Sequence, residues 1–193
     1  HTVQGQIEAL FERVKQEQGG LDILVNNAWG GYEERDGPFQ GPFWKWSLSR
    51  WDKMLRAGVW SHMATSYFAV PLMLPQHHAG KSLPSPRLII NTTLDVGEYR
   101  GGWLFYWTSK GTINQMTFGM AQELGRHRVA VIGLAPGWMR TEAVMANKRP
   151  HKRPVGEGLK ESESVEYAGR AVVALATDPD VMNKTGRILH TRD

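Results

Sequence analysis

The feature that most constrains the fold is an alternation between segments of helical periodicity and short apolar runs. Residues 7–14 place apolar side chains at the i, i+3, i+4, i+7 spacing of an amphipathic helix, and Gly19-Gly20 ends it. The run from Leu21 to Val25 that follows is short and mostly apolar, which favours a buried strand. The chain therefore opens with a predicted helix–strand pair.

The same alternation continues to the end of the chain. It predicts helices over 47–74, 106–124, 141–147 and 164–176, and strands at 88–90, 129–134 and 187–189. On the 106–124 helix we expect Ile113, Met116, Met120 and Leu124 to share one face. Continuously apolar strands between helices indicate a parallel sheet covered on both faces, so residues 1–193 are predicted to form one α/β domain.

The start of the chain departs from the usual order of such folds. A doubly wound sheet begins with a strand and a glycine-rich turn that binds phosphate. No G-x-G-x-x-G precedes the first predicted helix. Either the fold is a different one, or its beginning is absent from this chain.

Composition narrows the class of protein. With 41% hydrophobic and 22% charged residues, and no apolar run long enough to cross a bilayer, we expect a soluble protein without a membrane span. The absence of cysteine excludes disulfide scaffolds and thiol nucleophiles, and we expect a cytoplasmic location. The seven histidines lack ligand spacing, so no metal site is predicted. The basic run 148–154 is interpreted as a solvated loop and not as a nucleic-acid site.

Tyr106 and Lys110 are the first candidates for chemistry. Four residues apart on a predicted helix, their side chains lie on one face. An isolated phenol is only about one part in a thousand ionised at pH 7, and a neighbouring ammonium favours the phenolate. Such a pair can transfer a proton to or from a substrate oxygen. The spacing alone is weak evidence, because a surface tyrosine beside a helical lysine would look the same.

The surroundings of the pair strengthen this interpretation. Three predicted strands end in polar or Gly/Pro residues, at Asn26-Asn27-Ala28, at Thr92-Thr93 and at 135–141. The carboxyl ends of parallel strands meet at one edge of a sheet, where open α/β folds place their sites. Tyr106 follows Thr93 by thirteen residues.

Taken together, these motifs resemble the short-chain dehydrogenase/reductase family, with its N-N-A-G, Ser, Y-x-x-x-K and P-G-x-x-x-T pattern, over 21–189. One branch of the family, dehydrogenase/reductase member 1, is similar to this chain in three places: residues 26–29, the aromatic loop from Trp29 to Trp51, and residues 175–179. The resemblance implies a Rossmann-like doubly wound parallel sheet that lacks its first three strands here. It also implies an oxidoreductase that uses NAD or NADP on a carbonyl or alcohol substrate, and a homodimer or homotetramer.

The resemblance also implies roles for single residues. Tyr106 would be the catalytic acid/base, Lys110 would lower its pKa and bind the nicotinamide ribose, and Thr93 would orient the substrate oxygen, with Thr92 as its alternative. The residues implied to line the cofactor are Asn27, Ala28, Thr92, Tyr106, Lys110, Pro136, Gly137, Met139 and Thr141.

Three departures from the family pattern leave a second reading open. Trp29 stands in place of the glycine of N-N-A-G, and Gly58 stands where the family has a catalytic asparagine. The phosphate-binding turn is missing, so we interpret the chain as an N-terminally truncated one. The alternative to an enzyme is a non-catalytic relative that kept the fold for binding or assembly.

The segment from Trp29 to Trp51 is longer and more aromatic than the family minimum. It includes Tyr32, Phe39, Phe43, Trp44 and Trp46. We expect these side chains either to wall an apolar substrate pocket or to form a subunit contact or a cap on the core.

Overall fold

A computed structural model describes residues 1–31, 41–74, 86–99, 101–142, 145 and 162–192. Its core is a parallel sheet in the order β1-β2-β3-β4, formed by Ile23–Asn26, Arg87–Thr92, Val129–Ala135 and Ile188–His190. The main helices are α1 (Gln4–Gln18), α2 (Leu48–Lys53), α3 (Ser61–Met73), α4 (Leu104–Leu124) and α7 (Val165–Thr177). Short helical turns occupy Phe43–Lys45, Gly125–His127 and Val181–Lys184. The predicted α/β fold with a parallel sheet is confirmed.

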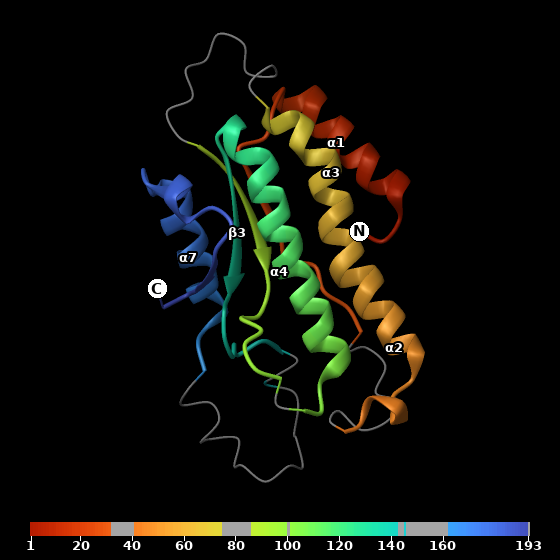
Figure 1. The fold of residues 1–193 in the computed structure, drawn as a ribbon. Helices are drawn as coiled ribbons and strands as arrows, with labels where there is room; N and C mark the ends of the chain where they lie inside the picture. Colours follow the sequence, from red (N-terminus) through yellow and green to blue (C-terminus); the bar gives the residue numbers. More distant parts are fainter. Residues whose placement is uncertain (32–40, 75–85, 100, 143–144, 146–161, 193) are drawn as a thin grey trace.

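The helices cover the two faces of the sheet. Figure 1 shows α1, α3 and α4 on one side of β3 and α7 on the other. Alternate residues of each strand point to opposite faces, so Ile89 and Val131 pack under α3 and α4, whereas Ile90 and Ile132 pack under α7. This double cover explains why the strands are apolar without interruption.

The element boundaries agree closely with the periodicity. The predicted helices 106–124 and 164–176 appear as α4 and α7, and each predicted strand is found within two residues of its place. Ser47 stands at the N-cap of α2, and its Oγ accepts a hydrogen bond from the backbone N–H of Ser49. The predicted helix 141–147 and the basic run 148–154 lie largely or wholly outside the described residues.

Two features differ from the expectation. The long helix predicted over 47–74 contains a π-helical segment, Met54–Trp60, between α2 and α3. On α4 the predicted apolar face is wrong in part, because Thr117 and Ala121 are buried while Met116 and Met120 are only half-buried. The buried face of α4 thus includes small and polar side chains, which allow close packing on β3 and which apolar periodicity does not detect.

The first strand is the least covered part of the sheet. On the α7 side, Ile23 and Val25 remain 43% and 41% exposed. Among the described strands the order simply follows the sequence, so none of them reverses the direction of winding. No helix in the described part of the chain is both long and apolar enough to cross a membrane.

Candidate active site

The carboxyl ends of β1, β2 and β3 lie at one edge of the sheet because the three strands are parallel. Helix α4 begins beside this edge and carries Tyr106 and Lys110 in its first two turns. The structure therefore places Lys110 next to Thr92 and Thr93, with Tyr106 one turn earlier on the same helix. Two motifs that are separate in the sequence thus meet at one place.

A buried amide network fixes the ends of β1 and β2. The Asn26 amide nitrogen donates hydrogen bonds to Asn91 Oδ1 and Ser66 Oγ, each at 2.9 Å. Asn91 in turn donates to Thr117 Oγ1 at 3.0 Å, which joins the network to α4. The sequence analysis did not single out Asn91, although an asparagine inside an apolar strand signals a buried polar role. The network sets the two strand ends, and hence the site, against α3 and α4.

Lys110 is buried at the centre of the site. Its Nζ donates a hydrogen bond to the backbone oxygen of Thr92 at 3.1 Å and lies 3.9 Å from the ring centroid of Trp29. Burial lowers the pKa of Lys110 to about 7, because the charged form loses its water. At neutral pH the side chain can therefore both take up and release a proton.

Tyr106 is half-buried and packed among aromatic rings. Trp29 meets its ring edge-on at 5.4 Å between centroids, and Lys110 Nζ lies 5.7 Å from the Tyr106 ring centroid. Burial raises the pKa of Tyr106 to about 12. The cause of this rise is the loss of hydration, and the expectation that Lys110 lowers the Tyr106 pKa stays a prediction.

The two threonines at the end of β2 are held differently. Buried Thr93 donates its hydroxyl to Asn114 Oδ1 at 2.5 Å and contacts the Lys110 backbone oxygen at 3.3 Å. Thr92 donates its hydroxyl to the backbone oxygen of Asn26 at 3.2 Å. Asn114, which the sequence analysis missed, also donates to Leu94 O and so ties α4 to the segment after β2. In this conformation the Thr93 hydroxyl is directed at α4.

His62 on α3 is a second titratable group that the sequence analysis did not identify. It is buried, and its Nε2 lies 3.1 Å from the backbone oxygen of Ala28. Burial, and next the charge of Lys110, lower the pKa of His62 to about 4. The imidazole is therefore neutral at physiological pH, and the hydrogen bond to a carbonyl identifies Nε2 as the protonated nitrogen.

The remaining predicted cofactor residues lie along the same edge. Asn27 is exposed and Ala28 half-buried after β1, and Pro136 and Gly137 follow β3. Gly137 has a φ of 73°, which favours glycine, and a Cβ built there would meet no atom within 4 Å. Thr141 donates its backbone N–H to Met139 O at 2.9 Å. The backbone at Gly137 is thus open to close approach by a ligand.

The aromatic segment after β1 divides into two parts. Trp46 is buried in a small cluster with Met54 and Phe105, so it serves as core. The exposed Phe43 and Trp44 line a hollow of about 510 Å³, together with Trp46, Leu48, Trp51, Leu104, Phe105 and Thr108. Tyr106 does not line this hollow. Tyr32 and Phe39 lie outside the described residues.

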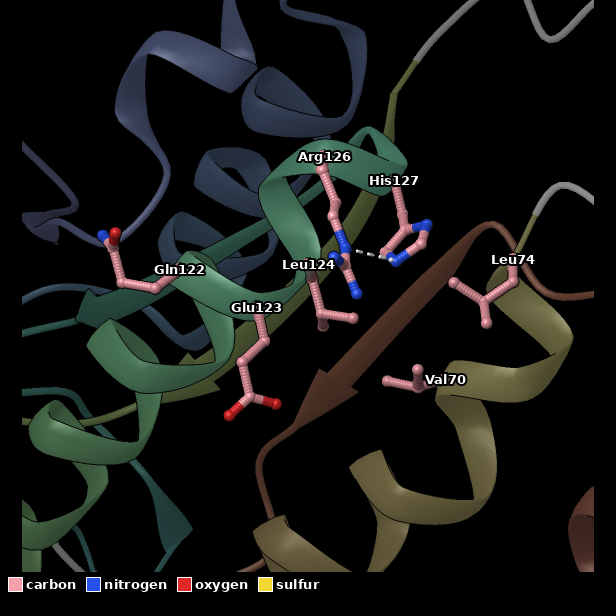
Figure 2. Close-up of a pocket in the computed structure, with 7 residues that line it drawn as sticks. All are labelled: Val70, Leu74, Gln122, Glu123, Leu124, Arg126 and His127. Carbon is pink, nitrogen blue, oxygen red and sulfur yellow. Dashed lines mark hydrogen bonds between the residues drawn. The ribbon is translucent and has the colours of Figure 1, made fainter.

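A second hollow lies at the far end of α4. Figure 2 shows Val70 of α3, and Leu74 just after it, facing Glu123, Arg126 and His127. Arg126 Nε and His127 Nε2 are 3.1 Å apart. This end of α4 lies where the chain enters β3, away from the carboxyl ends of the strands, so we do not assign it to the chemistry. Within the described ranges no three His, Asp or Glu side chains gather as a metal site.

Comparisons with known proteins decide the family. The sequence profile described as short chain dehydrogenase matches residues 2–152. The chain belongs to the short-chain dehydrogenase/reductase family. It is 33% identical to mouse dehydrogenase/reductase SDR family member 1, over 98% of this chain and 61% of that protein, which confirms the predicted resemblance to this branch. It is 29% identical to the Escherichia coli K12 5-keto-D-gluconate 5-reductase over 75% of this chain and 52% of the reductase.

Solved structures of short-chain dehydrogenases share the fold. The Brucella melitensis 3-oxoacyl-[acyl-carrier protein] reductase, solved in complex with NAD, matches with a TM-score of 0.78 at 23% identity, covering 98% of this chain and 73% of that one. A 7α-hydroxysteroid dehydrogenase complexed with NADH and 7-oxo glycochenodeoxycholic acid matches with a TM-score of 0.76 at 22% identity, covering 98% of this chain and 69% of that one. The chain thus has the Rossmann-type architecture of the family and spans about three fifths of the length of its mouse relative.

Proposed function

We propose that this protein is an NAD(P)-dependent oxidoreductase in which Tyr106 is the acid/base and acts on a carbonyl or alcohol. The observation that carries the proposal is the meeting of Tyr106 and Lys110 with the ends of β1 and β2, inside a largely buried site. Family membership supports oxidoreductase chemistry in general. Because the chain spans 61% of its mouse relative, the activity of the whole protein is part of the proposal.

The residues at the edge of the sheet fit the nicotinamide half of a dinucleotide. Lys110 supplies a cationic donor that can hydrogen-bond ribose hydroxyls, and Gly137 leaves its backbone open to close approach. The nicotinamide side of the cofactor would also contact Pro136, Met139 and Thr141. The adenosine side would contact Asn27 and Ala28. Solved structures that share this fold contain NAD, NADH or NADP, which supports this class of cofactor.

The protonation states favour carbonyl reduction at neutral pH. A reduced nicotinamide bound at this edge of the sheet would supply a hydride to the carbonyl carbon. Tyr106, with its pKa raised to about 12, stays protonated and donates its phenolic proton to the carbonyl oxygen, which yields the alcohol. Lys110, with a pKa of about 7, then returns a proton to the phenolate and is reprotonated from solvent. In the oxidative direction each transfer runs in reverse.

The test compares two tyrosine variants over a panel of ketones and aldehydes with NADH and NADPH. Tyr106→Phe removes the hydroxyl and is expected to lower kcat by about a hundredfold or more, since a positioned acid contributes about 10² to 10⁴. Tyr67→Phe is the matched control, because Tyr67 is 72% exposed on α3. Unchanged turnover in Tyr106→Phe would refute the assignment. The assays use the full-length protein, and a wild type that binds neither cofactor would favour the non-catalytic alternative.

Three finer expectations remain proposals. The substrate is a small carbonyl or alcohol compound, the protein assembles as a homodimer or homotetramer, and it resides in the cytoplasm. The family supports the first, and size measurement in solution and localisation in cells test the other two. The choice between NAD and NADP follows from their relative dissociation constants.

A further inference from the structure

Trp29 and Gly58 occupy a shared space beside the candidate acid/base. A Cβ built on Gly58 would lie 2.4 Å from Trp29 Cζ3 and 2.6 Å from Cε3, closer than any real contact. The indole therefore fills the place that a side chain at position 58 would take. The two departures from the family pattern, Trp29 for glycine and Gly58 for asparagine, are one coupled exchange in space, which we call the Trp29–Gly58 pair.

Local structure brings the pair together. Gly58 is buried inside the π-helical segment Met54–Trp60, while Trp29 follows the end of β1. A π-helical turn widens a helix locally and is common at functional sites. The widened turn and the missing side chain together leave room for an indole where a regular helix with asparagine would present a polar group.

The indole contacts both members of the acid/base couple. Lys110 Nζ stands 3.9 Å from the Trp29 ring centroid, and the Tyr106 ring meets the indole edge-on at 5.4 Å and 80°. A cation over an aromatic face is attracted by the ring quadrupole, most strongly for tryptophan and when water is excluded. Lys110 is 6% exposed, so this contact takes place out of water.

We propose that Trp29 is the positioning residue for Lys110: its indole face holds the ammonium near the Tyr106 ring, and Gly58 makes room for the indole. The role of this contact in catalysis rests on the function proposed above. The groups that face Lys110 are Trp29 from the loop after β1, the Thr92 carbonyl from β2, Tyr106 from its own helix, and the neutral His62 from α3. Of the two aromatic rings, the indole is the nearer to the ammonium, with its centroid at 3.9 Å against 5.7 Å for the Tyr106 ring.

The first test asks whether the two positions exclude each other. Gly58→Ala is expected to lower the stability of the wild type, because the new methyl group overlaps the indole. In a protein that already carries Trp29→Leu, adding Gly58→Ala is expected to leave the stability unchanged or to raise it. The leucine is smaller than the indole and leaves space for the new methyl group. Urea denaturation of the four proteins measures this coupling. Equal losses in both backgrounds would overturn the steric part of the inference.

The second test asks whether the indole sets the state of Lys110, and it needs no turnover. In protein carrying isotope-labelled lysine, NMR follows the Lys110 side-chain resonance against pH, assigned by its loss in Lys110→Arg. The double variant Trp29→Leu/Gly58→Ala, in which the alanine partly refills the space, is expected to lower the Lys110 pKa by about one unit, a tenfold shift in protonation. Trp29→Phe should give a smaller fall and serves if the double variant does not fold.

Trp51→Leu is the matched control, since Trp51 belongs to the same aromatic cluster but packs on Phe105. Its Lys110 pKa should equal that of the wild type. If the Trp29 variants lose stability yet keep the wild-type Lys110 pKa, the indole only fills space and the inference is wrong. That failure is distinct from failure of the proposed function, which the Tyr106→Phe turnover decides.

Discussion

Lys110→Met tests the electrostatic description of the site through protein stability. The replacement keeps a long apolar side chain but removes the charge that burial disfavours. With a pKa of about 7 in the folded protein against 10.5 ordinarily, Lys110 binds fewer protons folded than unfolded between these pH values. Wild-type stability should therefore rise with pH through this window, by at most about 1.4 kcal/mol per pH unit.

The size of the effect follows from the same shift. Integrated from pH 7 to pH 10.5, the change is about 4 kcal/mol, so the stability of Lys110→Met relative to the wild type should fall by about that amount over the window. Below pH 7 Lys110 itself contributes no further change, and the remaining difference between the curves comes from His62, whose pKa the charge of Lys110 helps to lower. Tyr106, whose pKa is raised to about 12, lowers stability only above about pH 10, and it does so in both proteins.

Urea denaturation at a series of pH values provides the measurement. Lys15→Met is the control, because Lys15 is an exposed residue of α1 with 51% side-chain exposure. The difference in unfolding free energy between Lys15→Met and the wild type should not change by more than a few tenths of a kcal/mol across this pH range. Parallel pH profiles for wild type and Lys110→Met would refute the claim that Lys110 titrates in a dry site.

Two further predictions concern the scaffold of the site. Asn91→Leu should cost about 2 kcal/mol in urea denaturation, because it leaves the Asn26 amide and the Thr117 hydroxyl with fewer partners in a buried place; an unchanged midpoint would argue against the network. Gly137→Val should weaken NADH binding at least tenfold in a fluorescence titration, because φ of 73° disfavours valine and its side chain fills the open approach. Unchanged affinity would remove Gly137 from the cofactor site.

The periodicity of the sequence was sufficient to predict most of the architecture. Strands that are apolar at every position, such as 129–134, arise only where both faces of a sheet are covered, and the structure confirms this for β3. Gly19 marks the end of α1 with a left-handed φ of 75°, as the sequence suggested. These signals depend only on residues that are neighbours along the chain, so a single sequence is enough to detect them.

The finer structure of the site depends on contacts between distant positions. Trp29 and Gly58 look like unrelated departures along the chain, and only the fold shows that one fills the space of the other. His62 joins the site through α3, where no motif marks it. The raised pKa of Tyr106 likewise depends on burial, which the spacing of Tyr106 and Lys110 does not report.

We propose above all that Tyr106 donates the proton during nicotinamide-dependent carbonyl reduction. The most direct measurement is the single-turnover rate of reduced-cofactor oxidation at saturating cofactor and ketone, for Tyr106→Phe against Tyr67→Phe. We expect Tyr67→Phe to react at the wild-type rate, and Tyr106→Phe to be slower by about a hundredfold or more while still binding the cofactor. Equal rates for the two variants would contradict this proposal.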